Sequence, residues 1–171
     1  MTAPMLVLVY GLPGSGKSAL ARAFVARYGG THINSDLVRA ALGLRGKYGA
    51  AGNARVYAAM LAETRAVREA GGRAVVDSTF YRAGIREPFE RMAGELGVPL
   101  FRIAVKAGEE TIRQRLGKPR PDSEADFAVY EKIRDQFEPW LAPFLELWSD
   151  AHPLDDLVRV LYQYIQTSHD Y

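Results

Sequence analysis

The sequence predicts an α/β fold in which helices cover both faces of a parallel sheet. Along its 171 residues, short apolar runs alternate with longer stretches whose apolar side chains recur at helical spacing. Such alternation is typical of parallel strands that are joined by helices. A glycine-rich turn separates the first strand from the first helix, and no interior segment has the composition of a domain linker. We therefore expect one domain that spans residues 1–171.

Four segments read as strands, and a fifth is ambiguous. Residues 5–10 and 73–77 are apolar runs rich in β-branched residues, and residues 31–35 are short and alternating. Residues 99–105 form another apolar run. Residues 144–148 fit either a strand or a helix, and we favour a fifth strand.

The remaining periodic segments are predicted as helices. Ile85, Phe89, Met92 and Leu96 follow one another at spacings of four, three and four, which places them on one helix face. Residues 123–126 have the pattern of a capping box, which predicts a helix start. Residues 43–52 are rich in glycine and are predicted as a loop. The predicted helices cover residues 18–28, 36–42, 54–70, 85–96, 109–116, 123–137 and 153–165.

Residues 11–18 match the phosphate-binding loop G-x-x-x-x-G-K-[ST] at every fixed position. Its glycines let the backbone approach phosphates closely, and its N–H groups and the following helix N-terminus face a polyanion. Lys17 is expected to reach the β- and γ-phosphates, and the Ser18 hydroxyl to hold Mg²⁺. The predicted nucleotide-binding residues are Gly11, Gly14, Ser15, Gly16, Lys17 and Ser18. The loop predicts a P-loop NTPase, a three-layer sandwich that uses ATP and Mg²⁺; a glycine-rich turn that binds nothing is the alternative.

Two acidic residues are candidates for the chemistry. Asp77 ends the strand 73–77, where it can hold Mg²⁺ directly or through water; the alternative is a cap of the next helix. Asp36 follows the second strand, where it can accept the proton of an attacking hydroxyl. Arg39 lies one helical turn later and can bind an anionic group on the molecule that carries this hydroxyl and accepts the phosphate. The alternative for Asp36 and Arg39 is a surface ion pair at a helix start.

A basic segment is predicted to form a lid over residues 113–126. Mobile arginines can neutralise the charge of a transferring phosphate while the lid excludes water. We favour Arg115 and Arg120 as the working pair; a solvated basic helix face is the alternative. The basic residues of this segment are Arg113, Arg115, Lys118 and Arg120.

Aromatic side chains lie near these candidates in the sequence. They can stack on a base, although residues of this kind more often belong to a core. The aromatic candidates are Tyr48, Tyr57, Phe80 and Tyr81. The histidines, His32, His152 and His169, have no spacing typical of a metal site.

Composition limits the other classes of protein. The net charge of +2 is too small to indicate a nucleic-acid binder by itself, and the chain has no cysteine for a disulfide framework or a thiolate zinc site. No apolar stretch approaches the length of a membrane span. We therefore expect a cytoplasmic protein that needs neither a membrane nor an obligate protein partner.

Several motifs together resemble the phosphate-loop kinases related to 5′-hydroxyl polynucleotide kinases, a pattern shared with zeta-toxin-like and antibiotic phosphotransferase kinases. They stand in order at residues 11–18, 33–39, 75–80, 115–120 and 123–126. The resemblance implies a five-stranded parallel sheet and covers nearly the whole chain. The phosphatase or ligase domain that many polynucleotide kinases carry has no room here, which leaves the acceptor open.

The resemblance also implies roles for individual residues. Asp36 corresponds to the general base, and Arg39 to the arginine that contacts the phosphate of the acceptor. Arg120 corresponds to a lid arginine on the nucleotide phosphates. Asp77 and Thr79 correspond to an Asp-x-Thr segment that lines the acceptor site.

The sequence thus predicts an ATP- and Mg²⁺-dependent kinase that phosphorylates a hydroxyl group. The favoured acceptor is the 5′-hydroxyl of a nucleic acid, and the alternative is a small molecule such as a sugar, an antibiotic or a nucleotide-sugar. A P-loop ATPase or regulator that is not a kinase is the third reading. The sequence lacks the Asn-Lys-x-Asp motif of GTPases, and Ser78 follows Asp77 where ring ATPases have a second acid.

Overall fold

The computed structural model describes residues 3–118 and 126–168 and contains a five-stranded sheet in the order β2-β3-β1-β4-β5. All neighbouring strands pair in parallel. The strands are β1 (Met5–Tyr10), β2 (Thr31–Asn34), β3 (Arg73–Ser78), β4 (Leu100–Lys106) and β5 (Leu145–Trp148). The predicted fold class is confirmed, and residues 145–148 form a strand as favoured.

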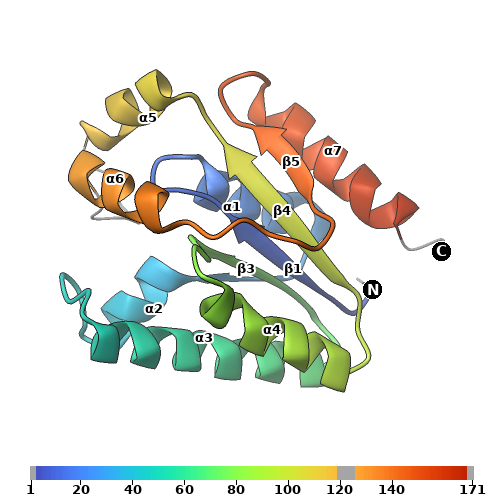
Figure 1. Ribbon diagram of the computed structural model, residues 1–171. Helices are drawn as coiled ribbons and strands as arrows, with labels where there is room; N and C mark the ends of the chain where they lie inside the picture. The colour runs from blue at the N-terminus through green and yellow to red at the C-terminus, as the bar shows by residue number, and fades with distance from the viewer. Residues whose placement is uncertain (1–2, 119–125, 169–171) are drawn as a thin grey trace.

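Helices connect the strands and cover both faces of the sheet (Figure 1). They are α1 (Lys17–Tyr28), α2 (Ser35–Ala41), α3 (Ala50–Glu69), α4 (Ala83–Glu95), α5 (Glu109–Leu116), α6 (Phe127–Gln136) and α7 (Leu154–Thr167). Among the described residues, no helix is both long and apolar enough to cross a membrane.

Two apolar clusters hold the layers together. On one face, Phe24 of α1 and Leu161 of α7 pack on alternate residues of the central strands, and both are fully buried. On the other face, Met60 of α3, Phe89 of α4 and Trp140 of the segment before β5 form a second cluster. The side chains of a buried strand alternate between the two faces, which is why β1 is apolar at every position.

The ends of α3 and α6 differ from the prediction. α3 begins at Ala50, not at residue 54, because Asn53 N–H already donates to Gly49 C=O (2.9 Å) and alanine favours helix at the start. α6 begins at Phe127, where Asp126 is the N-cap and its carboxylate accepts from the N–H of Val129 (3.0 Å). Of the predicted capping box at 123–126, only Asp126 lies among the described residues, and its short carboxylate on extended backbone is the cap of α6.

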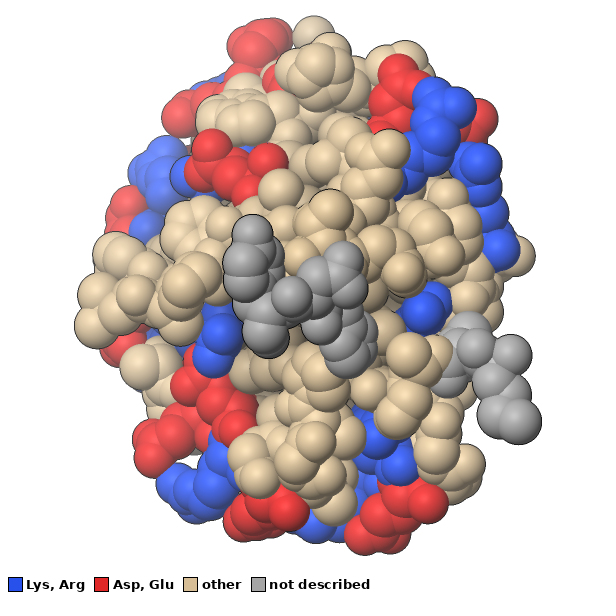
Figure 2. Space-filling view, turned by 90° about the vertical axis from the view of Figure 1, so that its right-hand side faces the viewer, with Lys and Arg blue, Asp and Glu red and all other residues tan. Residues whose placement is uncertain are grey.

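Charges do not gather by sign on the face shown in Figure 2, where acidic and basic side chains are interspersed. The described residues of this face therefore form no broad positive field for a polyanion.

Candidate active site

The phosphate loop lies between β1 and α1 and is shaped by its glycines. Gly14 and Gly16 have φ of 79° and 97°, in the left-handed region that a side chain disfavours. A Cβ at Gly11 would lie 2.4 Å from the carbonyl oxygen of Val105, so only glycine permits this approach to β4. Lys17 is the first residue of α1, so its side chain lies at the N-terminus of the helix that follows the loop.

Asp77 is fully buried at the end of β3 and is surrounded by hydrogen-bond donors. The Ser18 hydroxyl donates to its Oδ1 (2.8 Å), and Asn34 Nδ2 donates to its Oδ2 (2.9 Å). His32 Nε2 also contacts Oδ2. The register of the strands brings Asn34 next to Asp77. Asn34 on β2 pairs with Asp77 on β3, and Val9 on β1 pairs with Asp77 from the other side.

These contacts determine the charge of Asp77. Burial alone would raise the pKa of its carboxyl group, but the hydrogen bonds from His32 and Asn34 and the charge of Lys17 outweigh burial and hold the pKa below its usual value. Asp77 is therefore an anion near neutral pH.

The oxygens of Ser18 and Asp77 fit Mg²⁺. The ion prefers hard oxygen ligands and usually binds through one or two carboxylates together with waters and phosphate oxygens. Among the described residues no group of three or more His, Cys, Asp or Glu could hold a metal ion, so phosphate oxygens would complete this site. Ser18 and Asp77 would hold the ion, directly or through water.

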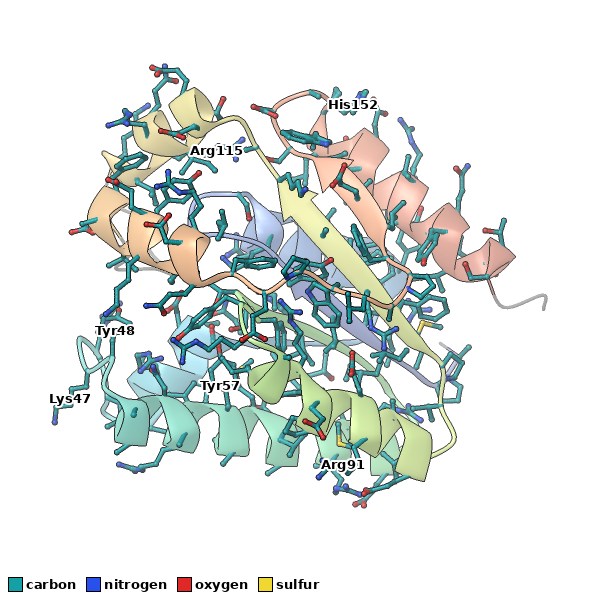
Figure 3. All side chains as sticks on the ribbon, viewed as in Figure 1. Lys47, Tyr48, Tyr57, Arg91, Arg115 and His152 are labelled. Atoms are coloured by element: carbon teal, nitrogen blue, oxygen red, sulfur yellow. The ribbon has the colours of Figure 1, made fainter. Side chains whose placement is uncertain are left out.

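Arg115 holds the phosphate loop from the side of α5. Its Nη1 donates to the carbonyl of Gly14 (3.0 Å) and to the hydroxyl of Ser149 (2.8 Å). The Ser149 hydroxyl in turn donates to the carbonyl of Ser15 (2.5 Å). Figure 3 shows Arg115 above the phosphate loop and Tyr57 below it. This arginine thus contacts the loop backbone in the structure, and a contact with phosphate stays a prediction.

Replacing Ser149 with alanine is expected to weaken ATP binding. The change leaves Arg115 and the Ser15 carbonyl each without one partner, which should cost about 1–2 kcal/mol, or a roughly five- to thirtyfold higher Kd. Calorimetric titration with ATP measures this, and Ser168→Ala at the exposed end of α7 is the control. An unchanged Kd for Ser149→Ala would show that the loop does not depend on this link.

Asp36 and Arg39 lie on α2, directly after β2. Asn34 caps this helix by accepting from the N–H of Leu37 (2.9 Å), so Asp36 lies in the first turn, two residues after a side chain that contacts Ser18. Arg39 is buried and donates to the carbonyl of Lys47 (2.6 Å) and to Asn53 Oδ1 (2.8 Å). These bonds order the segment between α2 and α3. The contact of Arg39 with an acceptor stays a prediction.

A second pocket of about 640 Å³ lies between α3, the start of α4 and α6. Tyr57 connects it to the phosphate site, since its hydroxyl lies 2.9 Å from Ser78 Oγ, next in the chain to Asp77. Burial raises the pKa of Tyr57, and hydrogen bonds with Ser78 and Thr79 only partly offset the rise, so the hydroxyl stays neutral. Its aromatic and polar lining includes Tyr48, Asn53, Tyr57, Tyr81, Arg82 and Lys132.

Three of the four aromatic candidates line this pocket, and the fourth does not. Tyr48, Tyr57 and Tyr81 form its walls. Phe80 is fully buried and packs edge-on against Phe89, with ring centroids 5.3 Å apart, so it belongs to the core. Its φ of 45° is unusual for a residue with a side chain.

Residues 113–118 and 126 of the predicted lid are among the described residues. Arg113 stacks over the ring of Phe127 (3.9 Å) and pairs with Glu109 (3.5 Å) on the surface of α5. Arg120 and His169 lie outside the described residues. The catalytic role of Arg120 stays a prediction.

Three polar side chains of the site were missed from the sequence. His32 and Asn34 are two residues apart on β2, so their side chains lie on the same face of the strand. Two polar residues on one face of a short predicted strand were a usable signal. Ser149 gave no local signal, because it follows β5 by one residue and meets the loop only through sheet order.

Comparison with known proteins agrees with this architecture. The family model AAA_33, described as an AAA domain, matches residues 6–140. Among curated proteins, no sequence matches significantly. The resemblance to polynucleotide kinases in particular stays a prediction.

Several solved structures share the fold. Kti12 of Chaetomium thermophilum, in complex with ADP-AlF3, is 23% identical with a TM-score of 0.74, covering 95% of this chain and 97% of that one. The Mycobacterium tuberculosis APS kinase CysC, with AMPPNP and APS, is 17% identical with a TM-score of 0.73, covering 97% and 99%. A gluconokinase from Sinorhizobium meliloti is 18% identical with a TM-score of 0.65, covering 93% and 90%. The family match spans most of the chain and includes the phosphate loop and Asp77, and the chain therefore belongs to the AAA domain family described by AAA_33.

Proposed function

We propose that the protein transfers the γ-phosphate of ATP to a hydroxyl group of an acceptor that binds between α3, α4 and α6. The observation that supports the proposal is that the phosphate loop and the second pocket are linked by neighbouring residues. Asp77 contacts Ser18 of the phosphate loop, and its neighbour Ser78 contacts Tyr57, which lines the second pocket. A protein that only hydrolyses or senses a nucleotide needs one site, whereas phosphate transfer needs two that meet.

The residues divide the work in this proposal. Lys17 and the N–H groups of the loop bind the phosphates, and Ser18 and Asp77 hold Mg²⁺, which neutralises phosphate charge when bound. Asp36 accepts the proton of the attacking hydroxyl. Thr79 follows β3 next to Tyr57, which lines the acceptor pocket, and we assign Thr79 to the acceptor side of the site.

The similar structures support ATP as the nucleotide. One was solved with AMPPNP and another with ADP-AlF3, and two are named as kinases. Their acceptors, as named, are small molecules, which keeps a small-molecule acceptor as the second candidate.

The lining of the acceptor pocket favours a planar, anionic acceptor over a sugar. Tyr48 and Tyr81 present rings on which a base can stack, and Arg82 and Lys132 add positive charge. Among the described lining residues there is no carboxylate to accept hydrogen bonds from the further hydroxyls of a sugar, and Asp36, the proposed base for the reacting hydroxyl, lies outside this lining on α2. The 5′-hydroxyl of a nucleotide or of a nucleic-acid end is therefore the acceptor we propose.

A transfer assay with labelled ATP tests the proposal. A nucleoside 3′-monophosphate and a 5′-hydroxyl oligonucleotide should be much better acceptors than gluconate or an aminoglycoside. Tyr81→Ala should raise KM for the nucleotide acceptor roughly five- to 150-fold, because stacking on one ring contributes about 1–3 kcal/mol. Tyr81→Phe is the matched control, because it keeps the ring.

Other results of this assay would lead to different conclusions. Preference for gluconate or an aminoglycoside would keep the kinase and overturn the nucleotide acceptor. Slow ATP hydrolysis that no acceptor changes would instead indicate a non-kinase ATPase.

A further inference from the structure

A cavity of about 490 Å³, distinct from the acceptor pocket, lies on the outer flank of the phosphate loop. It is enclosed by β1, β4, α5, α6 and the segment between α6 and β5, and its volume falls in the range of small-molecule sites. Six of its sixteen described lining residues are aromatic. They are Tyr10, Tyr130, Phe137, Trp140, Phe144 and Trp148.

This cavity borders the phosphate loop but lies apart from Lys17, Ser18 and the acceptor pocket. The loop contributes Gly11, Leu12 and Ser15 to it, whereas the described lining does not include Lys17 or Ser18. Gly11 packs against the Val105 carbonyl there, so the cavity touches the loop on the side of β4. The lining also shares no residue with the described lining of the acceptor pocket.

The charges at the cavity are already balanced. Lys106 pairs with Glu146 (2.8 Å) at one side. Arg134 lies 3.6 Å from Glu109 and 3.2 Å from Asp135 at the other. Neither cation therefore favours an anionic ligand over a neutral one.

Two polar groups of the lining lack partners. Ser15 is 1% exposed and Trp140 is 8% exposed, and neither Ser15 Oγ nor Trp140 Nε1 has a hydrogen-bond partner among the described residues. Buried polar groups are nearly always hydrogen-bonded, so two orphans at one cavity are unusual. Both can donate to an acceptor atom on a bound molecule.

Three of these rings pack on one another and form one aromatic surface, on which a flat molecule can lie. The ring centroid of Tyr10 lies 4.6 Å from that of Trp140, and Phe144 meets Tyr10 edge-on at 6.2 Å. Phe144 and Trp148 are about two-fifths exposed, so the cavity opens to solvent at these two rings.

We propose that this cavity binds a neutral, planar, mostly apolar small molecule that carries one hydrogen-bond acceptor, at the same time as nucleotide occupies the phosphate loop. Both tryptophans of the chain, Trp140 and Trp148, line the cavity, so intrinsic fluorescence reports directly on its occupancy.

The test uses the full chain and the neutral fluorescent ketone prodan. Saturable binding of one prodan per chain, with energy transfer from tryptophan and no change at saturating ADP, is expected. Ala107→Phe places a ring inside the cavity and should abolish this binding, whereas the matched Ala58→Phe, which lines the acceptor pocket, should leave it unchanged. Phe144→Ala, at the exposed rim, should weaken binding roughly tenfold without disturbing the core.

Three results would overturn the inference. They are the absence of saturable energy transfer, displacement of prodan by ADP, and equal prodan affinity in the wild type and Phe144→Ala. The second would assign the cavity to the base of the nucleotide, and the last would hold even if Ala107→Phe failed to fold.

Discussion

Replacing Lys17 with alanine is expected to lower phosphate transfer by roughly 10³-fold or more while the fold persists. The ammonium group neutralises charge on the β- and γ-phosphates as the transferred group moves, and preorganised charges of this kind make large contributions to such reactions. In this site the charge of Lys17 also helps to hold the pKa of Asp77 low. The loss of Lys17 therefore raises the pKa of the carboxyl group that faces Ser18. Turnover with labelled ATP measures the loss.

The matched control is Arg91→Ala. Arg91 is an exposed cation on α4 that pairs with Glu87 of the same helix (2.8 Å). Figure 3 shows that it lies far from Arg115. Both variants should melt within a few degrees of the wild type, because neither removes core packing. Near-normal turnover of Lys17→Ala would mean that the phosphate loop does not act in transfer.

Asp36→Asn is expected to slow transfer by about 10²-fold or more. The amide keeps the shape of the side chain but cannot take the proton of the attacking hydroxyl, and a general base typically contributes this much. ATP affinity should persist, because the residues that we propose to hold the nucleotide and its Mg²⁺ are those of the phosphate loop together with Asp77, which contacts Ser18. Single-turnover rates and calorimetric ATP affinity, measured together, separate the two effects.

Asp155→Asn, in the first turn of α7, removes a comparable helix-start carboxylate away from the site and should leave both quantities unchanged. Parallel loss of ATP affinity and rate in Asp36→Asn would assign Asp36 to the metal and not to the acceptor. A normal rate would remove it from the mechanism.

Local spacing alone determined much of this protein. The phosphate loop, the strand before it and the helix after it are contiguous, so their pattern is complete within residues 5–28. Asp77 was placed correctly at the end of a buried strand because that strand is a continuous apolar run. The fifth strand needed more, since four residues carry too little periodicity to separate strand from helix.

Only the tertiary structure decided which polar groups surround these residues. Ser149 meets Ser15 across 134 positions, and Arg115 meets Gly14 across 101, and no local pattern encodes either contact. Likewise, His32 and Asn34 reach Asp77 because β2 pairs with β3, and residues of α3, α4 and α6 together line the proposed acceptor pocket. The physical reason is that a sequence motif specifies the conformation of one short segment, whereas strand order and packing determine which segments meet, and that order depends on burying every apolar face of the chain at once.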